Sequence, residues 1–428
     1  MDMDALADRS DTNTRRVFAY FGPLTLLVFL AEPVSALLDI ATSYVLKNNL
    51  HATATQVATF RLVTAIPVYL ALVFGLARDW WNPLGLRDRG FLLIFAPLTA
   101  AIFTAMAFAP VSYRVLIVGT FLVMLSFRFV AAAYQGLLAL VGQEQLMSGR
   151  LSALFNVVSY LPAVGGAFLA GYVAEHVTPA KTFLLMAGLS LLIAGFGVLN
   201  PRAIFRHVYD QPLARRTTIT NDMKRLVRHR AIYPTVLIMF VFQFSPGTYT
   251  VLQYHLTNDL HASDAVYGYW YGIWSIGFMP VFLGYGYLCQ KLPFRKLLWW
   301  GTLLCIPQML PLAFIHSITS ALWLAIPMGL LGGIVVPAIY DLAMRSSPPG
   351  LQGTMMMLIA GVNFLAQRGG DLVGTWIYGS SSTHGFLYCA LATVASSALI
   401  LPLISLVPAG LIATADGEPN AELLVDNR

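Results

Sequence analysis

Residues 46–53 read LKNNLHAT, and residues 256–263 read LTNDLHAS, a near copy that begins 210 residues later. Each copy is polar and lies between two long apolar stretches. A second repeat, at an offset of 204 residues, matches three glycines with three later ones: Gly149, Gly165 and Gly166 with Gly353, Gly369 and Gly370. Two ordered matches at similar offsets indicate one unit of roughly 190 residues that is present twice. The repeat predicts two similar halves with a binding site where they meet.

The composition indicates whether water or lipid surrounds the chain. Hydrophobic residues make up 57% of the sequence and charged residues only 11%, which is too little charge to cover a soluble protein of 428 residues. The three cysteines are far apart, lie in or beside apolar stretches, and read as small core residues: Cys289, Cys305 and Cys389. We therefore predict a polytopic membrane protein without a cleaved signal, because the first apolar stretch is too long for a signal-peptide core.

Apolar stretches of about 20 residues, each long enough to cross a bilayer, follow one another along the chain. The predicted spans are 17–45, 56–79, 90–109, 112–141, 149–175 and 181–200 in the first half, and 231–256, 264–289, 296–315, 318–345, 353–379 and 384–409 in the second. We expect an all-α membrane protein with about twelve transmembrane helices in two pseudo-symmetric six-helix bundles. The predicted parts are an N-terminal tail (1–16), a first bundle (17–200), a basic linker (201–230), a second bundle (231–409) and a C-terminal tail (410–428).

The basic residues predict the orientation of these spans. If the N-terminus is cytoplasmic, 20 of the 26 Lys and Arg residues fall in cytoplasmic segments and only three fall in outer loops. This bias satisfies the positive-inside rule and places both termini in the cytoplasm, in a plasma membrane or bacterial inner membrane. The net charge of +6 is spread over many loops, so it indicates orientation and not nucleic-acid binding.

A short motif follows the second predicted helix. It reads GLARD at residues 75–79 and WWNPLGLRDR at residues 80–89. Twelve helices, a basic central loop and this Gly-x-x-x-Asp motif resemble the major facilitator superfamily. The spacer with Pro83 and Gly85, together with KLPFRKLL at 291–298 and SPPGLQGT at 347–354, is similar to the folate-biopterin transporter family. Distant relatives that deliver chlorophyll precursors or import cell-wall fragments have similar loops.

Several charged residues at the predicted cytoplasmic helix ends are candidates for gating. Asp79 with Arg87 and Arg89 can brace two helices, because a carboxylate accepts hydrogen bonds from arginines and from a helix N-terminus. The alternative is an ordinary positive-inside loop. Asp341 and Arg345 are four residues apart, which allows pairing within one helix near its inner end.

Charged side chains inside a spanning helix are costly, so they indicate pathways or ion pairs. Glu32 and Asp39 are seven residues apart on one face of the first helix, and both are candidates for proton coupling. Arg128 lies in the middle of the fourth helix with Gln135 on its face, and no acid is nearby in sequence. The resemblance places the first, fourth, seventh and tenth helices around a central cavity, where Arg128 would face Glu32 or Asp39. Arg128 is the first candidate for an anionic substrate; the alternative is a permanent structural ion pair.

The second half supplies further candidates for substrate contact. Helix 11 carries Asn363, Arg368 and Asp371, and the latter two can either serve the site, with Asp371 as a proton carrier, or pair within the helix. Gln243 begins a stretch through Tyr249 that interrupts helix 7 at Pro-Gly, which is tolerated where backbone lines a cavity.

Two aromatic residues of helix 8 are the last candidates for the site. Tyr271 and Trp274 can stack on a planar heterocycle, although an aromatic belt at the membrane surface is the stronger interpretation.

These observations favour a secondary active transporter that moves a small organic anion, pterin- or folate-like by the resemblance, by alternating access. A transporter of sugars, peptides or cell-wall fragments, and a non-transporting or pigment-delivery assembly factor of the same fold, remain alternatives. No catalytic motif supports an enzyme. We expect no cofactor and no metal site. The expected partners are the solute, the lipid bilayer and protons as the candidate coupling ion, without nucleic acid, and the chain is expected to act as a monomer.

Overall fold

The computed structural model describes residues 3–33, 38, 42, 45–46, 50–201, 204–205, 219–381 and 384–419. Within these residues the regular structure is helical, and no strand occurs. The first half contains α1 (Met3–Ala31), α3 (Ala54–Tyr69), α4 (Ala71–Trp80), η2 (Pro83–Gly85), α5 (Asp88–Phe108), α6 (Tyr113–Glu144), α7 (Ser148–His176) and α8 (Pro179–Val198). α10 (Ile219–Arg228) lies within the predicted basic linker.

The second half repeats this order of long helices. It contains α11 (Ile232–Gln243), α12 (Thr250–Tyr254), η3 (His255–Asp259), α13 (Asp264–Lys291), α14 (Phe294–Cys305), η4 (Ile306–Phe314), α15 (Ile318–Gly332), α16 (Val335–Arg345), α17 (Gln352–Gly379), α18 (Gly385–Ala398), α19 (Ile400–Ile404) and α20 (Ala409–Ile412). Several predicted spans consist of two consecutive helices, such as α3 with α4 and α15 with α16. The predicted span 17–45 leaves the described residues after residue 33, apart from single positions.

One spanning segment, helix 7, is divided at the Pro-Gly pair where the sequence predicts it. α11 ends at Gln243 and α12 begins at Thr250, so the predicted interruption at Pro246-Gly247 is present. Tyr249, the last residue before α12, has a positive φ of 50°, which is unfavourable for a bulky side chain. The N–H of Gly247 donates to Thr393 Oγ1 of α18 at 2.8 Å, so the exposed backbone of the interruption is satisfied by a neighbouring helix.

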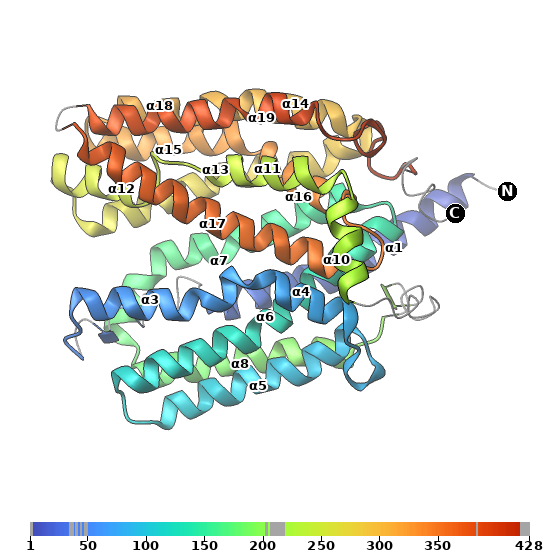
Figure 1. Cartoon of the computed structure of the whole chain (residues 1–428), viewed down its shortest axis with the longest axis horizontal. Coiled ribbons are helices and arrows are strands. Elements are labelled where there is room, and N and C mark those ends of the chain that lie inside the picture. The colour runs from blue at the N-terminus through green and yellow to red at the C-terminus, as the bar shows by residue number, and fades with distance from the viewer. Residues whose placement is uncertain are drawn as a thin grey trace.

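The helices form two layers that meet along a few shared helix pairs. Figure 1 shows α5, α6 and α8 on one side and α14, α15 and α18 on the other. Between them α7 packs against α13, and α17 packs against α4 and α6. The glycines of these helices allow close approach: a Cβ atom on Gly370 would lie 2.8 Å from the backbone nitrogen of Ser245.

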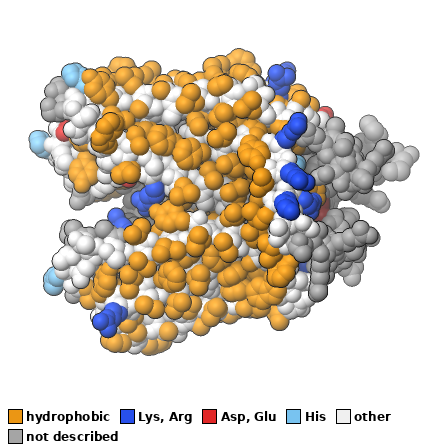
Figure 2. All heavy atoms as spheres, in the orientation of Figure 1, with side chains coloured by type: hydrophobic (Ala, Val, Ile, Leu, Met, Phe, Trp, Pro, Cys, Tyr) orange, Lys and Arg blue, Asp and Glu red, His pale blue; other side chains and the backbone are white. Residues whose placement is uncertain are grey.

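The outer surface is apolar along the length of the helices. Figure 2 shows hydrophobic side chains over the whole visible flank, with Lys and Arg concentrated toward one end. Large apolar side chains such as Phe108, Trp323 and Trp376 are more than 70% exposed. Such a surface is stable only against lipid, because water would impose a cost of about 25 cal/mol for each Å² of it. The three cysteines are buried and unbridged.

Candidate functional site

The two ends of the molecule, the termini end and the opposite end, carry different segments of the chain. The termini end carries α10, the start of α1 and the part of the chain that follows α19, while η3 and the start of α18 lie at the opposite end (Figure 1). Figure 2 shows an indentation at the opposite end, between the two layers, with basic side chains inside it. At the termini end the two halves are joined by hydrogen bonds.

Asp79, at the end of α4, contacts the start of α17 in the other half. Its Oδ1 accepts from the N–H of Gly353 at 3.1 Å, and its Oδ2 accepts from the N–H and the hydroxyl of Thr354, both at 2.6 Å. Arg78 also donates to Asp79 at 2.7 Å and holds Asp88 through two bonds of 2.6 and 2.7 Å. A carboxylate at a helix N-terminus meets unpaired N–H groups and the positive end of the helix dipole. The contact therefore ties the two halves together at this end.

Glycines make this contact possible. A Cβ atom on Gly75 would lie 2.5 Å from the carbonyl oxygen of Gly353, and one on Gly353 would lie 2.7 Å from Asp79 Oδ1. On α6, a Cβ on Gly136 would lie 2.7 Å from Arg78 Nε. No side chain fits at these three positions without movement of backbone or of the ion pair, so the glycine of the Gly-x-x-x-Asp motif is explained by helix contact.

A second set of bonds crosses between the halves nearby. The Nε2 of Gln143 on α6 donates to the carbonyl oxygens of Met344 and Ser347, each at 2.7 Å. Its Oε1 accepts from Gln352 Nε2 at 2.8 Å. These groups are buried, and each of their hydrogen bonds stabilises the closed state by about 0.5–1.5 kcal/mol relative to bonds with water. The closed termini end is thus held by several directional contacts.

The predicted pair of Asp341 and Arg345 is present and buried. Arg345 Nε lies 2.8 Å from Asp341 Oδ1, and the side chains are 5% and 0% exposed. Tyr285 on α13 donates its hydroxyl to Asp341 Oδ2 at 3.0 Å. The pair therefore fastens α16 to α13 within the second half at the termini end.

Arg128 forms an ion pair with Glu32, one of its two predicted acidic partners. Its Nη2 lies 2.6 Å from Glu32 Oε1; the Arg128 side chain is 4% exposed and that of Glu32 is 20% exposed. Asp39, the other candidate, lies outside the described residues. Within the described part of the chain, Arg128 Nε is buried without a hydrogen-bond partner. The Nε–H of Arg128 is therefore still able to donate a hydrogen bond to an anionic oxygen.

Side chains of the second half lie close to this ion pair. The Tyr340 hydroxyl on α16 is within electrostatic range of Glu32 and accepts from Asn363 Nδ2 on α17 at 3.5 Å. The ring of Tyr340 lies 4.8 Å from that of Phe155 on α7. Polar and aromatic groups from four helices and the chain after α1 thus meet between the halves. Gln135, on the same helix as Arg128, is half-buried.

The aromatic residues of α13 divide between the interior and the lipid. Trp270 is 1% exposed and stacks on Trp274 at a centroid distance of 5.4 Å, whereas Tyr269 is 45% exposed. Tyr271 and Trp274 are half-buried, and the buried Nε1 of Trp274 has no partner among the described residues. Tyr271 and Trp274 are thus less exposed than Tyr269, and their role in substrate stacking stays a prediction.

The predicted alternative of an ion pair between Arg368 and Asp371 is wrong for this structure. Asp371 accepts instead from the N–H of Thr250 at 3.0 Å and from its hydroxyl at 2.8 Å, and so caps the start of α12. Arg368 is exposed, and its guanidinium lies 5.4 Å from the ring centroid of Phe364. The interrupted helix 7 presents an N-terminus inside the protein, and that N-terminus attracts the carboxylate.

The predicted arginine partners of Asp79 need correction. Arg89 donates to the carbonyl oxygens of Gly197 and Val198 at 2.9 Å, within the first half. The backbone N–H of Arg87 donates to Asn82 Oδ1 at 2.6 Å. Arg78, adjacent to Asp79 in sequence, is the basic partner that the sequence interpretation missed.

Comparison with known proteins identifies the family. Residues 19–367 match the sequence profile of the Major Facilitator Superfamily, so the chain belongs to this superfamily of transporters. The predicted fold class is thereby confirmed, and the chain is a membrane transporter of a small solute and not an enzyme.

Particular relatives refine this assignment. The folate-biopterin transporter of Synechocystis sp. is 24% identical over 413 residues, which cover 90% of this chain and 81% of that protein. Folate transporter 2 of Plasmodium falciparum is 20% identical over 391 residues, covering 85% and 84% respectively. The resemblance to the folate-biopterin transporter family is therefore confirmed at modest identity.

Solved structures support the same fold. The superfamily transporter FucP, in its outward conformation, has a TM-score of 0.67 at 15% identity and covers 91% of this chain and 98% of that one. The human organic anion transporter MFSD10 has a TM-score of 0.64 at 17% identity, with coverage of 91% and 99%.

Proposed function

We propose that this transporter carries a small organic anion of the pterin or folate type by alternating access, with both termini in the cytoplasm and with Glu32 as a proton carrier. The names of the relatives support the substrate class. The closed termini end and the indented opposite end support an outward-facing state, if the positive-inside rule sets the orientation. The residue ranges 17–200 and 231–409 are the two bodies that rock against each other.

The buried guanidinium of Arg128 is the observation that carries this proposal. A buried arginine requires an anionic partner, and Glu32 supplies one oxygen to Nη2 while Nε stays unpaired. A substrate carboxylate at Nε would compete with Glu32 for the guanidinium, and the released Glu32 would then take up a proton more readily. Tyr340 packs against Phe155 of the first half, and the half-buried Tyr271 and Trp274 lie on α13, which packs against α7 of the first half. These three rings are the candidates to stack on a planar solute.

Ligand-dependent thermal shifts of the purified protein test the proposal. The panel contains folates, pterins, sugars and peptides. We expect folates or pterins to raise the melting temperature of the parent protein and of a Tyr388→Phe control, whose exposed side chain lies on α18. Arg128→Gln should abolish that shift while the unliganded protein stays folded.

The structural alternative makes a different prediction. If the ion pair serves stability alone, Arg128→Gln leaves Glu32 without its partner and lowers the free energy of unfolding by about 3–5 kcal/mol. Glu32→Gln in the same background should then restore the melting temperature. A stable Arg128→Gln protein with unchanged ligand shifts would eliminate the substrate role of Arg128.

A further inference from the structure

The internal repeat of the chain predicts a symmetric partner for the Asp79 contact. Asp79 caps α17, in which Gly353 is the second residue. The repeat pairs Gly353 with Gly149, which is the second residue of α7. If the halves are related by two-fold symmetry, a carboxylate of the second half is expected at the N-terminus of α7.

The helix that corresponds to α4 does not supply this carboxylate. α13 ends with Cys289, Gln290 and Lys291, none of which is acidic. The acid comes instead from Asp416, which follows α20. Its Oδ1 accepts from the N–H of Gly149 at 2.8 Å, and its Oδ2 accepts from Arg150 Nε at 2.7 Å.

The surroundings of the two helix starts are alike. A Cβ atom on Gly149 would lie 2.9 Å from Cys289 Cβ and 3.1 Å from Asp341 Oδ2. On the other side, a Cβ on Gly353 would lie 2.7 Å from Asp79 Oδ1. Each helix start is thus seated against a helix end of the other half with no room for a side chain. At each helix start one carboxylate also accepts hydrogen bonds from the glycine N–H and from an arginine.

The C-terminal segment, residues 409–419, is fastened to the second half. The N–H of Asp416 donates to the carbonyl oxygen of Cys289 at 2.8 Å, and the N–H of Phe294 donates to that of Thr414 at 3.2 Å. Arg345 Nη1 also donates to the carbonyl oxygen of Thr414, at 3.1 Å. Leu411 and Ile412 are buried. The segment must therefore move with α13 and α16, although the sequence interpretation treated it as a tail.

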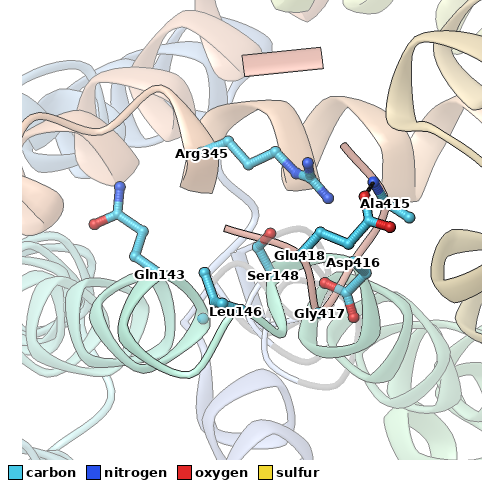
Figure 3. Close-up of a pocket in the computed structure, with 9 residues that line it drawn as sticks. Gln143, Leu146, Ser148, Arg345, Ala415, Asp416, Gly417 and Glu418 are labelled. Carbon is cyan, nitrogen blue, oxygen red and sulfur yellow. Dashed lines mark hydrogen bonds between the residues drawn. The ribbon is translucent and has the colours of Figure 1, made fainter. Parts of the chain in front are cut away.

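The side chain of Asp416, by contrast, holds the first half. Its carboxylate is 0% exposed, and its partners Gly149 and Arg150 belong to α7. Figure 3 shows Arg345 of α16, Ser148 of α7 and Asp416 converging around one small pocket that both halves line. A buried carboxylate is costly unless a positive charge and hydrogen-bond donors balance it. The position of Asp416 is therefore set by Arg150 and by the start of α7.

We propose that the C-terminal segment is a second gating latch, in which Asp416 holds α7 as Asp79 holds α17. This inference rests on the proposed alternating access, because the termini end can open only if the Asp416 contacts break. Without Asp416 the equilibrium shifts toward a state open at the termini end, and no group near Arg128 changes.

Two reporters in the full-length protein test the latch. The first is Cys289, which is 1% exposed and lies against Gly149, in a Cys305→Ser, Cys389→Ser background. Asp416→Ala should raise its rate of labelling by N-ethylmaleimide about tenfold or more, because two charge-assisted bonds are lost. Glu418→Gln is the matched control: its carboxylate accepts from Ala415 of its own segment, and its labelling should equal that of the parent.

The second reporter separates opening from local fraying. Spin labels at Leu84→Cys and Arg295→Cys, exposed positions on η2 and α14, in a background with all three native cysteines replaced by serine, measure the distance between the halves. Asp416→Ala should add a longer-distance population. If Cys289 labelling rises while this distance distribution stays that of the parent, the segment is only a cover, and the latch is refuted.

Two further variants distinguish the possible failures. Arg150→Gln, on the other side of the contact, should act in the same direction as Asp416→Ala and supplies the test if that variant does not fold. Asp79→Asn reports whether the termini end opens at all. A response to Asp79→Asn without one to Asp416→Ala overturns the second latch alone, whereas no response to either variant overturns the proposed alternating access as well.

Discussion

Replacing Asp79 by asparagine should open the termini end of the transporter. The Asp79 side chain is 3% exposed and accepts four hydrogen bonds, from Arg78, Gly353 and twice from Thr354. Asparagine retains one acceptor oxygen. Its NH₂ group is a donor and cannot accept hydrogen bonds from the N–H groups that surround this position. Loss of the charge and of two or more of these bonds should destabilise the closed end by about 3 kcal/mol, roughly a 150-fold shift.

Distance measurement between the spin labels at positions 84 and 295 follows this equilibrium directly. We expect Asp79→Asn to convert a single short distance into a mixture with a longer, open population. Transport should slow while solute affinity changes little in a state-independent assay, because Asp79 touches no solute. Arg89→Gln is the control, since Arg89 bonds to carbonyl groups of its own half. Equal distance distributions for Asp79→Asn and parent would show that Asp79 does not hold the termini end closed.

Two other substitutions follow from the same packing. Gly353→Ala should open the termini end as Asp79→Asn does, because its Cβ would press on the Asp79 carboxylate; Gly379→Ala, where no atom lies within 4 Å of the new Cβ, should leave the spin-label distances unchanged. Asp341→Asn should lower the free energy of unfolding by about 3–5 kcal/mol, because Arg345 would stay buried without its ion pair. A melting temperature within one or two degrees of the parent would contradict this second prediction.

The sequence predicts those features that depend on local periodicity. Apolar length predicts the spanning segments, Pro246-Gly247 predicts the interruption of helix 7, and the spacing of Asp341 and Arg345 predicts their pairing within one helix turn. Because Arg128 lies within a spanning helix and has no acid nearby in sequence, its partner is expected among the few carboxylates of the predicted spans. Glu32 is one of these.

Contacts between distant segments could not be predicted from these patterns. Asp371 is suitably spaced from Arg368 for an ion pair, yet it caps α12, because the end of an interrupted helix inside the protein has unpaired N–H groups. Asp79 pairs with its neighbour Arg78 and caps α17 of the other half, a contact that local spacing does not predict. Asp416 lies 267 residues from Gly149, and only the repeated glycine hinted that α7 needs a cap.

Uptake into proteoliposomes measures directly whether the protein transports folate or biopterin and whether Arg128 is required. Radiolabelled folate and biopterin are offered to vesicles that contain the parent or Arg128→Gln protein in equal amounts, with and without a proton gradient. We expect that the parent accumulates at least one of these solutes, faster with the gradient, and that folded Arg128→Gln protein does not. Absence of uptake of either solute by the parent, or equal uptake by the two proteins, would contradict it.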